Sequence, residues 1–118
     1  MSYFEDEKQP PPPDEASICR CLSFLARTDK EEADARALVK ALEENKKTIK
    51  ALAYLQADGT NADRENQAHA SSEFKKYLED YENAVADHAL ISNKRKRAEL
   101  IIEVWRSINS NRRAGMVT

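Results

Sequence analysis

The sequence predicts an all-α protein, on three observations. The 118 residues include only 2 Gly, too few for the tight turns of a β-sheet protein or for a glycine-rich phosphate loop. A charged fraction of 34% beside a hydrophobic fraction of 41% suits amphipathic helices, because Ala, Leu, Lys, Arg and Glu are good helix formers. Apolar residues recur at steps of three and four, the period of paired helices. We therefore expect an elongated antiparallel helical hairpin, coiled-coil-like, with a short N-terminal helix, that forms an oligomer.

Residues 1–14 are expected to form an acidic, proline-rich tail. Tyr3 and Phe4 precede a short acidic run, and the four consecutive prolines of 10–13 favour extended backbone and exclude a helix. This composition is typical of a disordered, solubilising tail. The alternative is a peptide motif for a partner, formed by Tyr3 and Phe4 or by the prolines.

The rest of the chain is expected to form a single helical domain over residues 15–113, followed by a short C-terminal tail, 114–118. Its helices are predicted at about 16–27, 29–57 and 62–113.

Four local signals set these helix boundaries. Thr28 and Glu31 have the spacing of a capping box and predict a new helix start. Gly59 is suited to end that helix, and Thr60 or Asn61 to cap the next one. Gly115 is the first stop signal after it.

A heptad seam is predicted on the second helix, with one polar interruption at Asn45. Asn45 either fixes the register of the pairing or faces solvent. A turn at Gly59 places Leu42 opposite the Tyr77 region. The predicted seam is Ala35, Leu38, Leu42, Asn45, Ile49, Leu52 and Gln56 on this helix, and Phe74, Tyr77, Leu78, Tyr81, Val85, His88 and Ile91 on the next.

The third predicted helix is too long for the second to cover. Its surplus, residues 91–112, presents a wide apolar face around Trp105. The N-terminal helix is one candidate cover and a second copy of the chain is the other, and we expect both. The predicted oligomer or partner interface consists of Leu22, Leu25, Ile101, Ile102, Trp105 and Ile108.

Several chemistries are not expected. Cys19 and Cys21 point to opposite sides of a helix, which suits chelation badly, so neither a metal nor another cofactor is predicted. No nucleophile, base and acid occur in a recognisable order, and a thin hairpin has little room for a pocket, so the chain is not expected to be an enzyme. Without a long apolar segment or a signal peptide, we expect a cytoplasmic protein that does not contact membranes.

Basic residues give the clearest functional signal. The net charge of the chain is only −2, but its C-terminal stretch, 91–118, contains seven basic and two acidic residues. On a helix, Arg95, Arg106 and Arg113 align as a stripe with Lys96 beside it. The stripe is either a solvated flank or a surface that tracks phosphates. A second candidate nucleic-acid contact is formed by Lys46, Lys47, Lys50 and Tyr54.

The segment from Lys46 to Tyr54, with the glycine turn and the later Glu-Val-Trp-Arg of 103–106, resembles phage recombination mediators of the UvsY type and other small helical phage proteins. Lys47, Lys50 and Tyr54 fall on the matching stretch. The resemblance implies an oligomeric, non-enzymatic protein that binds single-stranded DNA and helps to load a recombinase.

Two functions are therefore considered, and the first is preferred. The first is a phage accessory protein that associates with single-stranded nucleic acid and a recombination or replication protein. The alternative is a protein-binding module without nucleic-acid contact, such as an inhibitor of a host or defence enzyme, or a structural assembly factor.

Overall fold

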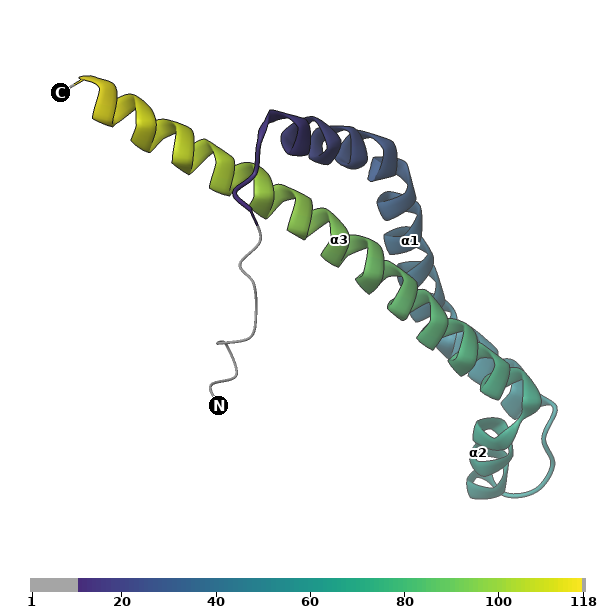
Figure 1. Ribbon diagram of the computed structural model, residues 1–118. Helices are drawn as coiled ribbons and strands as arrows, with labels where there is room; N and C mark the ends of the chain where they lie inside the picture. The colour runs from purple at the N-terminus through teal and green to yellow at the C-terminus, as the bar shows by residue number, and fades with distance from the viewer. Residues whose placement is uncertain (1–10, 118) are drawn as a thin grey trace, which may run out of the picture. The chain divides into compact units, whose positions relative to one another are not determined.

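The computed structural model describes residues 11–117, with side chains up to residue 115. Three helices account for almost all of this stretch, and no strand occurs within it, so the all-α prediction is confirmed (Figure 1). The helices are α1 (Glu15–Leu55), α2 (Asn61–Ala70) and α3 (Ser72–Val117). Residues 1–10 of the predicted tail lie outside the described residues, and 11–14 have no regular structure.

The chain groups into two compact units where the sequence predicted one domain. Unit 1 consists of the described parts of Met1–Arg27 and Arg95–Thr118, and unit 2 is Thr28–Lys94. Both long helices therefore contribute to both units, and each unit is described by itself.

Unit 2 pairs the C-terminal part of α1 with the N-terminal part of α3 (Figure 1). The Tyr77 hydroxyl donates a hydrogen bond to the Leu42 carbonyl, the pair that the sequence placed opposite one another. His88 Nε2 lies 3.2 Å from Glu32 Oε1. Because the partner on α1 moves toward the N-terminus as the residue on α3 moves toward the C-terminus, the two segments run antiparallel.

The connection between them is fixed by local caps. Gly59 has a φ of 111°, the left-handed region that glycine tolerates best. Thr60 then caps α2 as one of the two predicted caps, and its side chain and that of Asp63 form a reciprocal capping box. The Tyr54 hydroxyl donates to Asn61 Oδ1 at 2.7 Å, which ties the end of α1 to the start of α2.

Unit 1 places the first part of α1 beside the C-terminal part of α3. Asp14 caps α1 by accepting the Ser17 N–H at 2.8 Å, and this hydrogen bond lowers the pKa of the Asp14 carboxyl. Ile18 and Ala98 are buried. Arg95 Nη1 donates to the Leu25 carbonyl at 2.7 Å.

Three predicted helix boundaries are wrong. α1 continues through Thr28, which is buried within the helix, so the capping-box pattern there is not used. No Gly or Pro occurs near Thr28, and nothing in the backbone forces a break there. Conversely, the predicted helix 62–113 is interrupted at Ser71, which has extended backbone with a ψ of 148°. α3 then continues through Gly115 to Val117, because a glycine with negative φ only weakens a helix.

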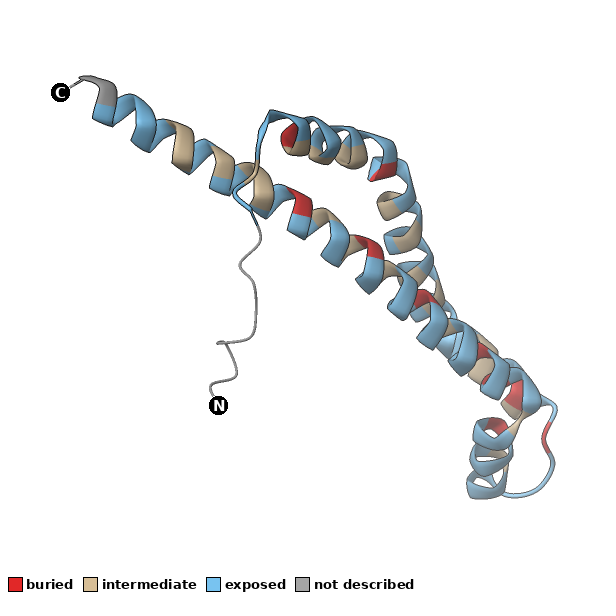
Figure 2. Cartoon of the chain, in the orientation of Figure 1, coloured by how far each residue is buried: buried red, intermediate tan, exposed pale blue. Residues whose placement is uncertain are grey.

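The predicted seam is right at Ala35, Leu42 and Ile49 of α1 and at most positions of α3, and it is wrong at the others. Leu38, Asn45, Leu52 and Gln56 of α1 and Leu78 and Val85 of α3 are exposed. Val39 and Ala53, which follow Leu38 and Leu52, take the inward positions there. Bulky rings from α3 fill the interface, so small side chains such as Ala53 suit the close approach on α1. The observed inward row of unit 2 is Thr28, Glu32, Ala35, Val39, Leu42, Ile49 and Ala53 on α1, and Phe74, Tyr77, Tyr81, Ala84, His88 and Ile91 on α3. Figure 2 shows how sparsely buried residues occur along both helices.

Candidate nucleic-acid interface

The C-terminal part of α3 forms a basic hollow around Trp105, entirely within unit 1. Its volume is about 710 Å³, and three exposed arginines line it with the half-buried indole. Polar side chains that can donate to a phosphate complete the lining. The Trp105 hollow consists of Glu15, Glu103, Trp105, Arg106, Ser107, Asn109, Ser110, Arg112 and Arg113.

The electrostatic balance of the Trp105 hollow is positive. Arg106 Nη1 lies 3.1 Å from Glu103 Oε1, but the two side chains are 67% and 65% exposed, so water screens this pair and it contributes little. Glu15 is the second acid. Arg112 and Arg113 are in no ion pair among the described residues, so their charges are available to an anionic ligand.

The chain itself partly covers Trp105. A second hollow of about 370 Å³ brings Pro12, Pro13 and Asp14 beside Trp105 and Ile108. These three residues precede α1 and belong to the predicted tail, whereas the expected cover was the N-terminal helix. The other residues of the predicted interface have mixed exposure: Leu25, Ile101 and Ile102 are half-buried, and Leu22 is exposed.

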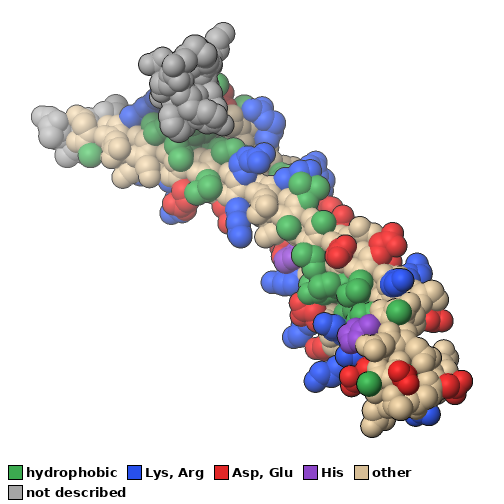
Figure 3. Space-filling model, turned by 90° about the horizontal axis from the view of Figure 1, so that it is seen from below, with side chains coloured by type: hydrophobic (Ala, Val, Ile, Leu, Met, Phe, Trp, Pro, Cys, Tyr) green, Lys and Arg blue, Asp and Glu red, His purple; other side chains and the backbone are tan. Residues whose placement is uncertain are grey.

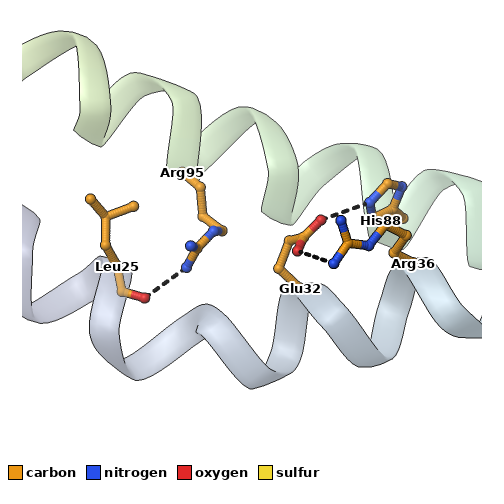
Figure 4. Close-up of polar contacts among 5 residues, drawn as sticks. All are labelled: Leu25, Glu32, Arg36, His88 and Arg95. Carbon is orange, nitrogen blue, oxygen red and sulfur yellow. Dashed lines mark hydrogen bonds and ion pairs between the residues drawn. The ribbon is translucent and has the colours of Figure 1, made fainter.

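Arg95 does not belong to an outward stripe with Arg106 and Arg113. Its guanidinium is directed toward α1 and bonds to the Leu25 carbonyl (Figure 4). This correction follows from the heptad, since Arg95 takes the inward position between Ile91 and Ala98. Lys96, the next residue, is exposed.

The second predicted basic group lies in unit 2 and is less suited to base stacking than expected. Lys46 and Lys47 are exposed, and Lys50 is half-buried. The Arg64 guanidinium lies 5.6 Å from the centre of the Tyr54 ring, so one face of that ring already carries a cation.

A polar contact between the helices of unit 2 was missed by the sequence reasoning. Glu32 contacts His88 from one carboxylate oxygen and Arg36 Nη2, at 3.7 Å, from the other (Figure 4). The sequence did contain a signal for this contact, because Glu32 is four residues after Thr28 and three before Ala35, the spacing of inward positions in a heptad.

Stacked aromatic rings line the same interface. The ring centroids of Phe74 and Tyr77 are 5.9 Å apart, and those of Tyr77 and Tyr81 are 6.2 Å apart. Burial raises the pKa of Tyr77, with the Glu43 charge adding to the effect. The hydrogen bond to Glu43, 3.0 Å from the hydroxyl, raises the pKa of Tyr81.

One flank of unit 2 carries an apolar groove of about 400 Å³ that the sequence did not predict. Mostly apolar side chains of α1 line it, together with charged side chains and a tyrosine of α3. The leucine groove consists of Leu42, Ile49, Leu52, Ala53 and Gln56 from α1, with Glu73, Lys76, Tyr77 and Asp80 from α3.

Among the described residues, no group of three potential metal ligands comes together. No helix in the described part of the chain is long and apolar enough to span a membrane. Comparison with known proteins found no matching family model, no matching curated protein and no matching solved structure.

Proposed function

We propose that this protein is a non-catalytic accessory protein that holds single-stranded nucleic acid in the Trp105 hollow. The proposal includes the antiparallel helical hairpin as its building block, a homo-oligomer, and a cytoplasmic role in phage recombination or replication. The main support is that Arg106, Arg112 and Arg113 line the same hollow as the Trp105 indole.

This set of side chains matches the chemistry of a single strand. Arginine guanidinium groups bind phosphate oxygens in bidentate geometry, and the indole offers a surface on which any base can stack. Stacking on an aromatic side chain contributes about 1–3 kcal/mol per base, so Trp105 and the arginines together support sequence-tolerant binding.

Fluorescence anisotropy with a labelled oligothymidine of about eight nucleotides, titrated across a salt series, tests the proposal. Three phosphate contacts on a single strand predict a slope of about −2 in log K against log salt concentration. Arg112→Gln with Arg113→Gln should reduce both the affinity and the slope.

The matched control is Lys46→Gln with Lys47→Gln, which removes two exposed charges from unit 2 and should leave binding nearly unchanged. Circular dichroism of both variants should match that of the parent chain. Absence of binding at low salt, or equal losses in the two double variants, would contradict the proposal.

The leucine groove favours the second candidate, a protein-binding module. Leu52, which lines the groove, is 56% exposed, and Leu38, which lies outside it on the same face of α1, is 53% exposed. Exposed leucines beside an apolar groove are typical of a helix-binding surface.

A further inference from the structure

The leucine groove has the features of a docking site for another helix. Leu38 and Leu52 are fourteen residues apart, so they lie on one face of α1, with Asn45 midway between them. Neither is covered by the α1–α3 pairing in unit 2, because the inward positions belong to their neighbours Val39 and Ala53.

The α3 side of this flank is acidic. Glu73, Asp80 and Asp87 are exposed and follow one another at intervals of seven, so they lie on a single face of α3. Lys76 Nζ is 3.9 Å from Asp80, a long and exposed pair that neutralises the row only weakly. The flank therefore suits a helix with an apolar ridge and a basic edge.

The chain itself carries such a helix. On the outward side of α3, Leu100 and Val104 are 64% and 49% exposed and are one helical turn apart. Arg97 and Lys96 are three and four residues before Leu100, so both lie about one helical turn from it, and both are exposed.

The charge distribution along the chain matches these two surfaces. Residues 58–90, which supply the acidic row, include eight acidic and three basic residues. Residues 91–118, which supply the ridge, include seven basic and two acidic residues. Opposite charges of this kind fix the partner and the register of a helix in a groove.

We propose that the leucine groove binds the Leu100–Val104 ridge of a second copy of the chain. Leu100 and Val104 cover Leu52 in the groove, and Arg97 and Lys96 lie against Asp80 of the acidic row. The inference rests on the homo-oligomer proposed above and identifies the two surfaces that form it. The predicted interface around Ile101 and Trp105 is not part of this contact.

Sedimentation velocity of the full chain, over a concentration series at low and high salt, tests the contact. The parent chain should associate, and higher salt should weaken the association. Asp80→Arg and Arg97→Asp should each weaken it at least tenfold, and the two substitutions combined in one chain should restore it. Leu100→Ser should weaken it without loss of helicity, because the side chain is exposed.

Glu79→Arg is the matched control, since Glu79 is exposed and adjacent to Asp80 but lies outside the acidic row. It should associate like the parent chain. Oligomers that do not respond to the Asp80 and Arg97 substitutions, or that respond equally to Glu79→Arg, would overturn the groove contact and leave the oligomer standing. A monomer at every concentration would overturn the oligomer as well. Binding of the short oligonucleotide is unaffected by either result, so the two proposals fail independently.

Discussion

At the scale of single residues, polar side chains occupy inward positions of the helix pairing and each has a partner there. Glu32 pairs with His88 in unit 2, and Arg95 bonds to the Leu25 carbonyl in unit 1. A buried polar group without a partner costs about 1–3 kcal/mol. These side chains are half-buried, so the loss of a partner in another register of the helices should cost less than that. These contacts favour one register of the two helices more than they add to the stability of the fold.

The two inward tyrosines make stability depend on alkaline pH. Both have a pKa raised above the usual 10.0, Tyr77 mainly by burial and Tyr81 mainly by its hydrogen bond to Glu43. The unfolded chain therefore loses these protons at lower pH than the folded chain does. The free energy of unfolding should be unaffected by these groups below about pH 10, and should fall as the pH rises through 10 and beyond.

Urea denaturation at pH 8.5 and 10.5, followed by circular dichroism, measures this effect. The variant Tyr77→Phe with Tyr81→Phe should lose less stability between the two pH values than the parent chain. Tyr54→Phe, whose hydroxyl bonds to Asn61 instead, is the control and should keep the parental slope. A steeper slope in the double variant would contradict the assignment.

At the scale of elements, sequence signals predicted helix existence well and helix ends unevenly. The cap at Thr60 and the turn at Gly59 follow from local chemistry and were predicted. The capping pattern at Thr28 was overridden, because an inward, buried Thr28 continues the helical heptad row. The break at Ser71 has no Gly or Pro to mark it, so only the structure reveals it.

Ser71 serves two helices at once. Its backbone N–H bonds to the Ala68 carbonyl at the end of α2, and its hydroxyl oxygen accepts the Phe74 N–H at 3.2 Å at the start of α3. Ser71→Ala should therefore lower the free energy of unfolding by about 1 kcal/mol, the usual cost of a lost N-cap. Ser72→Ala, one residue later and exposed, should change it by less than about 0.5 kcal/mol. Thermal or urea unfolding of the two variants makes the comparison, and equal effects would contradict a capping role.

The candidate site was predictable only where a side chain faces outward. Trp105, Arg106 and Arg113 were found from composition and helical spacing, and all three line the Trp105 hollow. Arg112 was missed because it does not align with the predicted stripe. Arg95 was misplaced, because a basic run on a helix does not reveal which of its members faces a neighbouring helix.

At the scale of the whole molecule, the chain has two compact units with separate supporting contacts. The bond from Arg95 to Leu25 belongs to unit 1, and the bond from Tyr77 to Leu42 belongs to unit 2. Local opening of a protein follows such cooperative units, so loss of one contact should be felt mainly in its own unit.

Native-state hydrogen exchange should resolve the two units. Arg95→Gln should speed amide exchange mainly in residues 15–27 and 95–113, and Tyr77→Phe mainly in 28–94. Lys96→Gln, an exposed neighbour of Arg95, should leave the pattern unchanged. A uniform increase throughout the chain in both variants would show one cooperative unit instead.

The regular inward row also determines how the chain can change in length. Every seven residues return α1 and α3 to the same facing side, so in unit 2 the pairing is indifferent to whole heptads. If residues 33–39 are removed from α1 and 81–87 from α3, the pair Glu32–His88 becomes the next contact after the pair Leu42–Tyr77. Every remaining inward residue still faces the other helix. Removing a single residue turns everything beyond it by about 100° and sends the inward row to solvent. A helix pair of this kind can therefore be lengthened or shortened in steps of seven residues in both helices, and a smaller change disrupts the pairing.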